Sequence, residues 1–175
     1  MTAEDVLEVL DALARADVRP WLDGGWAIDA LVGEQTREHA DLDLALDAAV
    51  VAAAVEALRA LGYSEDPDAT PGLPARVVLT DAEGRHIDLH PLVFDDDGNG
   101  WQQLSASGRA WGLYPAADLR ATGIVGGRRV PCTSAELQHR FRMGYEWSDR
   151  DEHAMRVLSE RLGLPAPPDA PGTPR

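Results

Sequence analysis

Two aspartates in the first quarter of the chain are spaced so that they could hold a metal ion. Asp41 and Asp43 are separated by one leucine where the alternating segment 42–46 predicts a half-buried strand. Residues two apart in a strand point to the same face, with their Cα atoms roughly 7 Å apart. Paired carboxylates on a rigid strand suit Mg²⁺ that also holds substrate phosphates, and two such ions can stabilise an in-line phosphoryl displacement.

A glycine pair upstream could accept a phosphate group. Gly24 and Gly25 follow a predicted strand, 18–22, and precede a predicted helix, 26–32. Glycine lets the backbone approach a phosphate closely, and a helix N-terminus offers free N–H groups. Taken alone, such a pair is usually only a turn, and an Asp-x-Asp pair is usually the solvated face of an amphipathic strand.

A third carboxylate comes from a later strand. Asp88 stands in the segment His86-Ile-Asp-Leu-His90, where apolar residues alternate about it. A carboxylate near the metal pair could accept the proton of an attacking hydroxyl. The order strand, Gly-Gly, helix, Asp-x-Asp strand and third-carboxylate strand is much more specific than any one of its pieces.

The elements that must position these groups alternate between helix and strand, and the final third of the chain is helical. This order indicates an α+β fold. Apolar periodicity predicts helices at 4–16, 26–32, 48–61, 134–145 and 149–162, and strands at 18–22, 42–46, 76–80 and 86–92, with a hairpin at 123–130. Loops are expected at 64–74 and 95–100, where Pro, Gly and Asp are frequent.

Composition limits the classes of protein to consider. The chain has 175 residues, of which 45% are hydrophobic, enough for one domain with a small helical addition. A formal charge of -14 without a basic cluster disfavours binding to nucleic acid. This acidity could attract a cationic substrate, although general solubility explains it equally well.

The beginning of the chain and the cysteine content indicate a cytoplasmic protein. The first twenty residues are acidic and mixed, which argues against a signal peptide. No apolar run approaches the roughly 20 residues that a membrane-spanning helix needs. The single cysteine, Cys132, cannot form an internal disulfide and is expected to be buried.

The motifs resemble those of the DNA polymerase beta-like nucleotidyltransferase superfamily. They are similar in particular to its small antibiotic-modifying branch, the aminoglycoside adenylyltransferases and lincosamide nucleotidyltransferases. The similar pieces span about residues 5 to 163. They read Gly24-Gly-Trp-Ala-Ile-Asp-Ala, Gly33, Thr36-Arg37, His39, Asp41-Leu-Asp43, Ile87-Asp88-Leu-His90-Pro91 and Phe141-Arg-Met-Gly144-Tyr-Glu146, followed by Asp151 and His153.

Two details of the late block bear on the acceptor. The Gly-Tyr-Glu sequence leans toward the lincosamide side of the branch. The lincosamide members have an acidic residue directly after the histidine, whereas this chain has Ala154 after His153. The resemblance therefore supports the identity of the acceptor less strongly than it supports nucleotidyl transfer.

The resemblance implies a polymerase beta-like mixed sheet flanked by helices, with a helical C-terminal portion. Residues 1–97 would form the nucleotidyltransferase core, and 98–164 the acceptor-binding portion of the same compact unit. The tail 165–175 is rich in proline and is expected to be disordered.

Residue by residue, the resemblance implies Mg²⁺ ligation by Asp41 and Asp43, with Asp88 as general base or as a further metal ligand. Gly24 and Gly25 would line the triphosphate of an NTP, ATP in the first place. Arg37 would neutralise it, or would equally be a surface charge paired with Glu34 or Glu38. We assign acceptor binding to four further residues: His90, Trp101, Tyr145 and Glu146.

The expected activity is transfer of an NMP to a hydroxyl of a small-molecule antibiotic, a lincosamide rather than an aminoglycoside, by an enzyme that could be a homodimer. A biosynthetic nucleotidyltransferase and a non-catalytic, partner-binding member of the same fold are the alternatives. Retention of Asp41, Asp43 and Asp88 favours the enzyme, since degenerate members usually lose a metal carboxylate.

Overall fold

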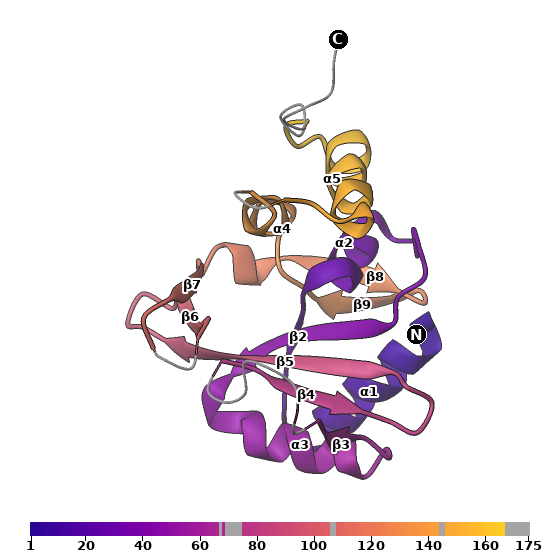
Figure 1. Ribbon diagram of the computed structural model, residues 1–175, viewed down its shortest axis with the longest axis vertical. Helices are drawn as coiled ribbons and strands as arrows, with labels where there is room; N and C mark the ends of the chain where they lie inside the picture. The colour runs from indigo at the N-terminus through magenta and orange to yellow at the C-terminus, as the bar shows by residue number, and fades with distance from the viewer. Residues whose placement is uncertain (67, 69–74, 106–107, 144–145, 167–175) are drawn as a thin grey trace.

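A mixed β-sheet forms the centre of the protein, as the computed structural model shows for residues 1–66, 68, 75–105, 108–143 and 146–166 (Figure 1). The strand order is β1-β2-β5-β4-β3, with β6 joined to the far end of β5 and β7 joined to β6. The sheet contains β1 (Trp21–Leu22), β2 (Asp41–Asp47), β3 (Ser64–Glu65), β4 (Val77–Thr80), β5 (His86–Phe94), β6 (Gly100–Gln103) and β7 (Trp111–Tyr114). Only β2 and β5 run parallel among these pairs, and the other pairs are antiparallel.

Helices cover both faces of the sheet (Figure 1). On one side lie α1 (Ala3–Arg15) and α3 (Val51–Arg59), and on the other α2 (Gly24–Val32), α4 (Ala135–Phe141) and α5 (Asp149–Leu162). A separate hairpin of β8 (Thr122–Val125) and β9 (Arg128–Pro131) packs beside α2. The charged residues of the predicted site therefore face the layer of α2, α4 and α5.

The alternation of β2 explains how the sheet separates its core from its polar face. Leu42, Leu44 and Leu46 are fully buried in the core that includes α1 and α3. Asp41 and Asp43, which alternate with these leucines, point to the opposite face because the side-chain period of a strand is two. Burial of the leucines thus fixes which face receives the carboxylates.

Local signals set the ends of the helices. Thr2 and Asp5 form a capping box at the start of α1. Gly33 ends α2 with φ +85° and Gly163 ends α5 with φ +73°, backbone conformations that favour glycine.

Most predicted elements are confirmed, and the differences have physical reasons. The helix expected at 48–61 begins as a 3-10 turn, Ala48–Val50, and continues as α3. The segment 64–74, expected to be a loop, begins with the short strand β3. The strands β6 and β7 were not predicted. Segment 100–103 carries glycine and two glutamines, and segment 111–114 carries glycine. They become strands by pairing with β5 and with each other. The helix expected at 134–145 ends at Phe141.

The sheet continues across residue 97, where the predicted nucleotidyltransferase core ends, since β6 pairs with β5 directly. The expectation of a disordered tail falls mostly on residues 167–175, which lie outside the described part of the chain. Within that part, we find no helix with the length and apolar character needed to cross a membrane.

Candidate active site

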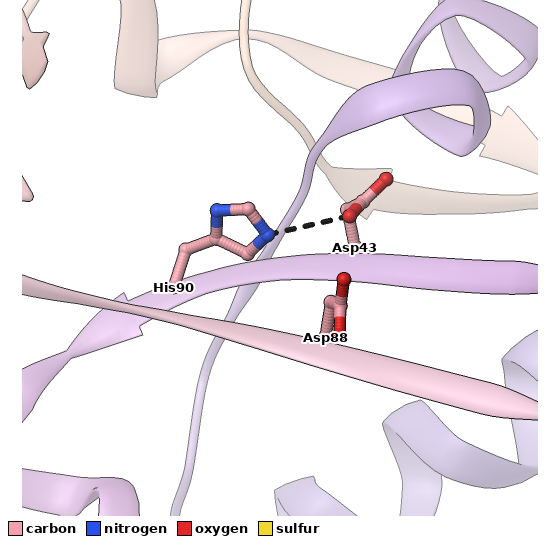
Figure 2. A group of neighbouring side chains, drawn as sticks. All are labelled: Asp43, Asp88 and His90. Carbon is pink, nitrogen blue, oxygen red and sulfur yellow. Dashed lines mark hydrogen bonds and ion pairs between the residues drawn. The ribbon is translucent and has the colours of Figure 1, made fainter. Parts of the chain in front are cut away.

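Asp43 on β2 and Asp88 on β5 occupy directly opposed positions of the two parallel strands. His90 follows two residues later on the same face of β5, and all three side chains point to one side of the sheet (Figure 2). One potential ligand atom from each lies within 4.8 Å of the others. The structure therefore unites two carboxylates that are 45 residues apart in the sequence.

Asp41 lies outside this group, at the first position of β2. Its side chain is 39% exposed, and its Oδ2 is 3.7 Å from Nη1 of Arg150 on α5. The predicted Asp41–Asp43 pair shares one face of β2, but the cluster that the structure shows consists of Asp43, Asp88 and His90.

The charges of the cluster shift the pKa values of its members in different directions. Burial would raise the pKa of Asp43, but the hydrogen bond and positive charge of His90 lower it overall. Burial, reinforced by the charge of Asp43, raises the pKa of Asp88, although Arg76 opposes this with Nη1 at 3.3 Å from Oδ2. A carboxyl with a raised pKa is the better proton acceptor of the two.

His90 is bonded at both ring nitrogens. Nε2 lies 3.3 Å from Oδ1 of Asp43, and the side-chain amide of Gln102 donates to Nδ1 at 3.0 Å. Burial acts to lower the pKa of His90, while the bond to Asp43 and its negative charge raise it above the ordinary value. The amide donor at Nδ1 opposes this rise, since it needs an unprotonated ring nitrogen as its acceptor.

The glycine pair forms the beginning of α2 directly against the carboxylate cluster. Gly24 has φ +57°, and a β-carbon there would lie 2.8 Å from Cγ of Asp43. A β-carbon on Gly25 would lie 2.6 Å from Cε1 of His39 and 2.7 Å from Nη2 of Arg37. Only glycine permits this approach, and the first N–H groups of a helix have no partner within the helix.

A buried pair fixes His39 under the turn. Its Nε2 is 2.6 Å from Oδ2 of Asp29, whose other oxygen accepts the hydroxyl of Thr36 at 2.6 Å. His39 is 3% exposed, and its ring stacks at 4.8 Å on that of Trp26, which is itself buried. These contacts place both residues in the packing beneath the glycine pair.

Arg37, Arg142 and Arg150 lie close enough at the site for the charges of the other two to act on Arg37. Burial lowers the pKa of Arg37, and the positive charges of Arg150 and Arg142 lower it further, although Asp41 opposes them. Arg37 donates to the carbonyl of Glu38 at 2.8 Å, and Glu34 pairs with Arg161 instead. The side chain of Arg37 thus lies near the glycine pair, and in the described part of the chain it pairs with neither the Glu34 nor the Glu38 carboxylate.

Sequence reasoning missed two of these arginines. The side chain of Arg142 is only 12% exposed, and its Nη1 donates to the carbonyl and the side-chain oxygen of Gln138 at 2.9 and 2.8 Å. Arg142 belongs to the late Phe-Arg-Met-Gly-Tyr-Glu block, which was the available signal. Arg150 had none, because its place near Asp41 depends on how α5 packs.

Two cavities open at the cluster. The first, of about 420 Å³, we call the Gly24 cavity, and the second, of about 410 Å³, the Asp88 cavity. The Gly24 cavity is lined by Asp23, Gly24, Asp43, Ala75, Arg76, His90, Gln102, Gln103, Leu104, Gly112, Tyr114, Gln138, Phe141 and Arg142. The Asp88 cavity is lined by Ala40, Asp41, Asp66, Arg76, Val78, His86, Asp88 and Arg150.

The four residues assigned to the acceptor are placed differently. His90 lines the Gly24 cavity. Trp101 lies on the other face of β6, where it contributes to a groove of about 530 Å³ beside α3 and donates to Asp95 at 2.9 Å. Glu146 is exposed and lines neither cavity, and Tyr145 lies outside the described residues.

Comparison with known proteins adds independent information. A family model described as aminoglycoside-2''-adenylyltransferase matches residues 5–158. The chain is 30% identical to a lincosamide resistance protein of Staphylococcus haemolyticus over 90% of this chain and 94% of that protein. It is 29% identical to a 2''-aminoglycoside nucleotidyltransferase of Klebsiella pneumoniae over 78% of this chain and 71% of that protein.

Solved structures show the same architecture. The lincomycin-bound lincosamide antibiotic adenylyltransferase LnuA superposes with a TM-score of 0.78 at 29% identity, covering 91% of this chain and 98% of that one. ANT(2")-Ia in complex with adenylyl-2"-tobramycin gives a TM-score of 0.70 at 21% identity, covering 92% and 89%. At that lower identity the likeness concerns the fold.

Proposed function

The chain belongs to the aminoglycoside-2''-adenylyltransferase family, and from this membership we propose that it is a magnesium-dependent nucleotidyltransferase acting on an antibiotic. It transfers an NMP from an NTP, ATP in the first place, to a hydroxyl of the acceptor, and thereby confers resistance. One observation carries the proposal, namely that Asp43 and Asp88 are opposed on parallel strands with the Gly24 turn packed against them.

The residues at this position fit a hard divalent cation. Asp41 and Asp43 share a face of β2 and would hold Mg²⁺ through carboxylate oxygens, the ligands that this ion prefers. Oδ1 of Asp88 is buried without a hydrogen-bond partner in the described part of the chain, so a cation or a proton there would satisfy it. When bound, Mg²⁺ neutralises charge on the triphosphate and orients the phosphate that is transferred.

The protein's own groups then bind the nucleotide and move a proton. The Gly24–Gly25 turn and the free N–H groups of α2 receive the triphosphate, and Arg37, Arg142 and Arg150 neutralise it. Asp88 takes the proton of the acceptor hydroxyl, whose oxygen bonds to the α-phosphorus while the bond to pyrophosphate breaks. The raised pKa of Asp88 suits this role.

The charges around the two cavities favour a lincosamide. Beyond Asp41, Asp43 and Asp88, the carboxylates among the described lining residues are those of Asp66 and the buried Asp23. The arginines that line the two cavities are Arg76, Arg142 and Arg150. A polycationic aminoglycoside would meet these arginines with few carboxylates to balance them, whereas a singly charged lincosamide tolerates them. We place the reaction in the cytoplasm, where NTPs are available.

The test is to mix purified protein with ATP, GTP, CTP or UTP, Mg²⁺, and either clindamycin, lincomycin, tobramycin or kanamycin, and to read adduct masses. We expect an AMP adduct of a lincosamide, lost with EDTA. An aminoglycoside adduct would reverse the choice of acceptor. No adduct in any combination would leave the biosynthetic or the non-catalytic alternative.

The role of Asp88 is tested with Asp88→Asn. As a base, Asp88 accounts for roughly 10²- to 10⁴-fold in kcat, and the variant keeps its affinity for Mg-NTP. A collapse of Mg-NTP affinity would make Asp88 a metal ligand instead.

A further inference from the structure

A closed ring of hydrogen bonds surrounds one side of Asp43. It starts at Oδ1 of Asp43, which lies 3.3 Å from Nε2 of His90, and continues from Nδ1 of His90 to Nε2 of Gln102 at 3.0 Å. Gln102 is 7% exposed, and the same amide nitrogen also donates to the carbonyl of Ala75 at 3.1 Å. Because a carbonyl only accepts, this second bond fixes which end of the Gln102 amide faces His90.

The other half of the ring runs through a buried tyrosine. The hydroxyl of Tyr114 is shared between Oε1 of Gln102 at 3.1 Å and Oδ2 of Asp23 at 2.8 Å. The backbone N–H of Asp23 donates to the carbonyl of Asp43 at 2.9 Å, which closes the ring. Asp43 is therefore held through its side chain by His90 and through its backbone by Asp23.

Asp23 is a rigid anchor for this ring. It is 3% exposed, and Thr133 and Gln138 donate to its Oδ1, the former at 3.1 Å. Its partners come from the β9–α4 region and from β7, whereas Asp43 comes from β2. The C-terminal elements thus reach the carboxylate cluster through buried polar contacts, and such networks restrict side chains strongly when they are satisfied.

We propose that Gln102 is a positioning residue for Asp43, acting through His90, and that Tyr114 holds Gln102 in the orientation this requires. The inference rests on the proposed function, because it assigns Gln102 to the same reaction. Without the amide, His90 loses its bond at Nδ1 and can rotate, so Asp43 loses the partner that fixes its carboxylate. Groups that orient a metal ligand typically contribute 10- to 100-fold to metal affinity or activity.

The first experiment compares Gln102→Met with Gln35→Met. Methionine keeps the length of the side chain but cannot hydrogen-bond to His90, and Gln35 is an exposed glutamine that lines neither cavity and donates to the carbonyl of Met1 at 3.3 Å. We expect Gln102→Met to lower kcat by about 10- to 100-fold and to weaken Mn²⁺ binding about tenfold, measured by electron paramagnetic resonance with a non-hydrolysable NTP. Gln35→Met should leave Mn²⁺ binding unchanged.

The second experiment is a double-mutant cycle with Tyr114→Phe, which keeps the ring packed at 5.0 Å against Phe141 and removes only the hydroxyl. If both residues act through one ring, the double variant is about as impaired as Gln102→Met alone. Should Gln102→Met fail to fold, Tyr114→Phe tested by itself against wild type retains the same expectation of weaker Mn²⁺ binding and lower kcat.

The outcomes separate this inference from the proposed function. Wild-type kcat and Mn²⁺ affinity in folded Gln102→Met, or fully additive effects in the cycle, overturn the positioning role while the enzyme remains a nucleotidyltransferase. If the wild-type protein forms no adduct with any NTP and antibiotic, the proposed function is overturned. The Mn²⁺ affinities of wild type and Gln102→Met still test whether Gln102 positions Asp43.

Discussion

Gly24 packs against Asp43 so closely that a β-carbon on the glycine would lie 2.8 Å from Cγ of the carboxylate and nearer still to Oδ2. The glycine also has φ +57°, which disfavours any other residue. Two independent restraints therefore require glycine where the proposed nucleotide-binding turn meets the carboxylate cluster.

Gly24→Ala is expected to lower kcat by roughly 100-fold, because the new methyl group displaces Asp43 from its reactive position. Gly33→Ala is the matched control, since Gly33 ends the same helix with φ +85° but has nothing within 4 Å of a built β-carbon. Both variants carry similar backbone strain. Equal losses of activity in the two would show that strain, and not contact with Asp43, is responsible.

Asp43→Asn is expected to reduce turnover by about 10²- to 10³-fold at saturating Mg²⁺, because a neutral amide is a poor Mg²⁺ ligand and compensates less charge. Asp47→Asn serves as control on the same strand, where the side chain of Asp47 accepts the N–H of Ala49 at 2.8 Å. Steady-state kinetics and a thermal melt measure both variants. Wild-type turnover in folded Asp43→Asn would remove the carboxylate cluster from the chemistry.

Arg142→Gln is expected to raise the KM for the NTP about 10-fold or more, since a hydrogen bond between charged groups is worth about 1.5–3 kcal/mol. The control is Arg140→Gln, two residues earlier, because Arg140 pairs with Asp118 at 2.7 Å and lines neither cavity. Isothermal titration with a non-hydrolysable NTP measures the affinity directly. Unchanged affinity in Arg142→Gln would leave triphosphate binding to Arg37 and Arg150.

Asp81 is expected to contribute to stability in a pH-dependent manner, away from the site. Burial would raise its pKa, but N–H donors from Arg85 and Glu83 and the Arg85 guanidinium, with Nε at 2.6 Å, lower it overall. A carboxyl whose pKa is lower in the folded than in the unfolded protein stabilises the fold above its unfolded pKa and loses that effect as the pH falls through the folded value. The ordinary value here is 3.8.

Asp81→Asn should therefore lower the free energy of unfolding by on the order of 1 kcal/mol at pH 7. The difference from wild type should shrink as the pH falls below about 3.8. Urea melts at several pH values measure this. A difference that stays constant from pH 7 to pH 2 would exclude the ionised carboxylate as its source.

Cys132 is expected to resist alkylation in the folded protein. The thiol is fully buried, and burial together with the nearby charge of Asp23 raises its pKa to about 12. Since the thiolate is the reactive form, iodoacetamide at pH 8 should modify it quickly only in denaturant, as mass spectrometry would show. Fast modification under native conditions would mean that the β9 region opens readily.

Local sequence patterns determined much of the candidate site. The alternation about Asp41 and Asp43 sets their common face because the core must bury Leu42, Leu44 and Leu46. The position of Asp88 between two buried apolar neighbours was predicted for the same reason. The Gly24–Gly25 turn was predicted from its two adjacent glycines. Periodicity is a local property, and one sequence is enough to show it.

Only the tertiary structure decided which groups meet. The register of β2 against β5 sets Asp43 opposite Asp88, with Asp41 turned toward Arg150. The segments 100–103 and 111–114 have weak strand signals, and pairing with β5 makes them strands. That pairing turns Gln102 toward His90 and Trp101 to the opposite face. These contacts could not be predicted from the sequence, because they depend on long-range packing that no short window of sequence contains.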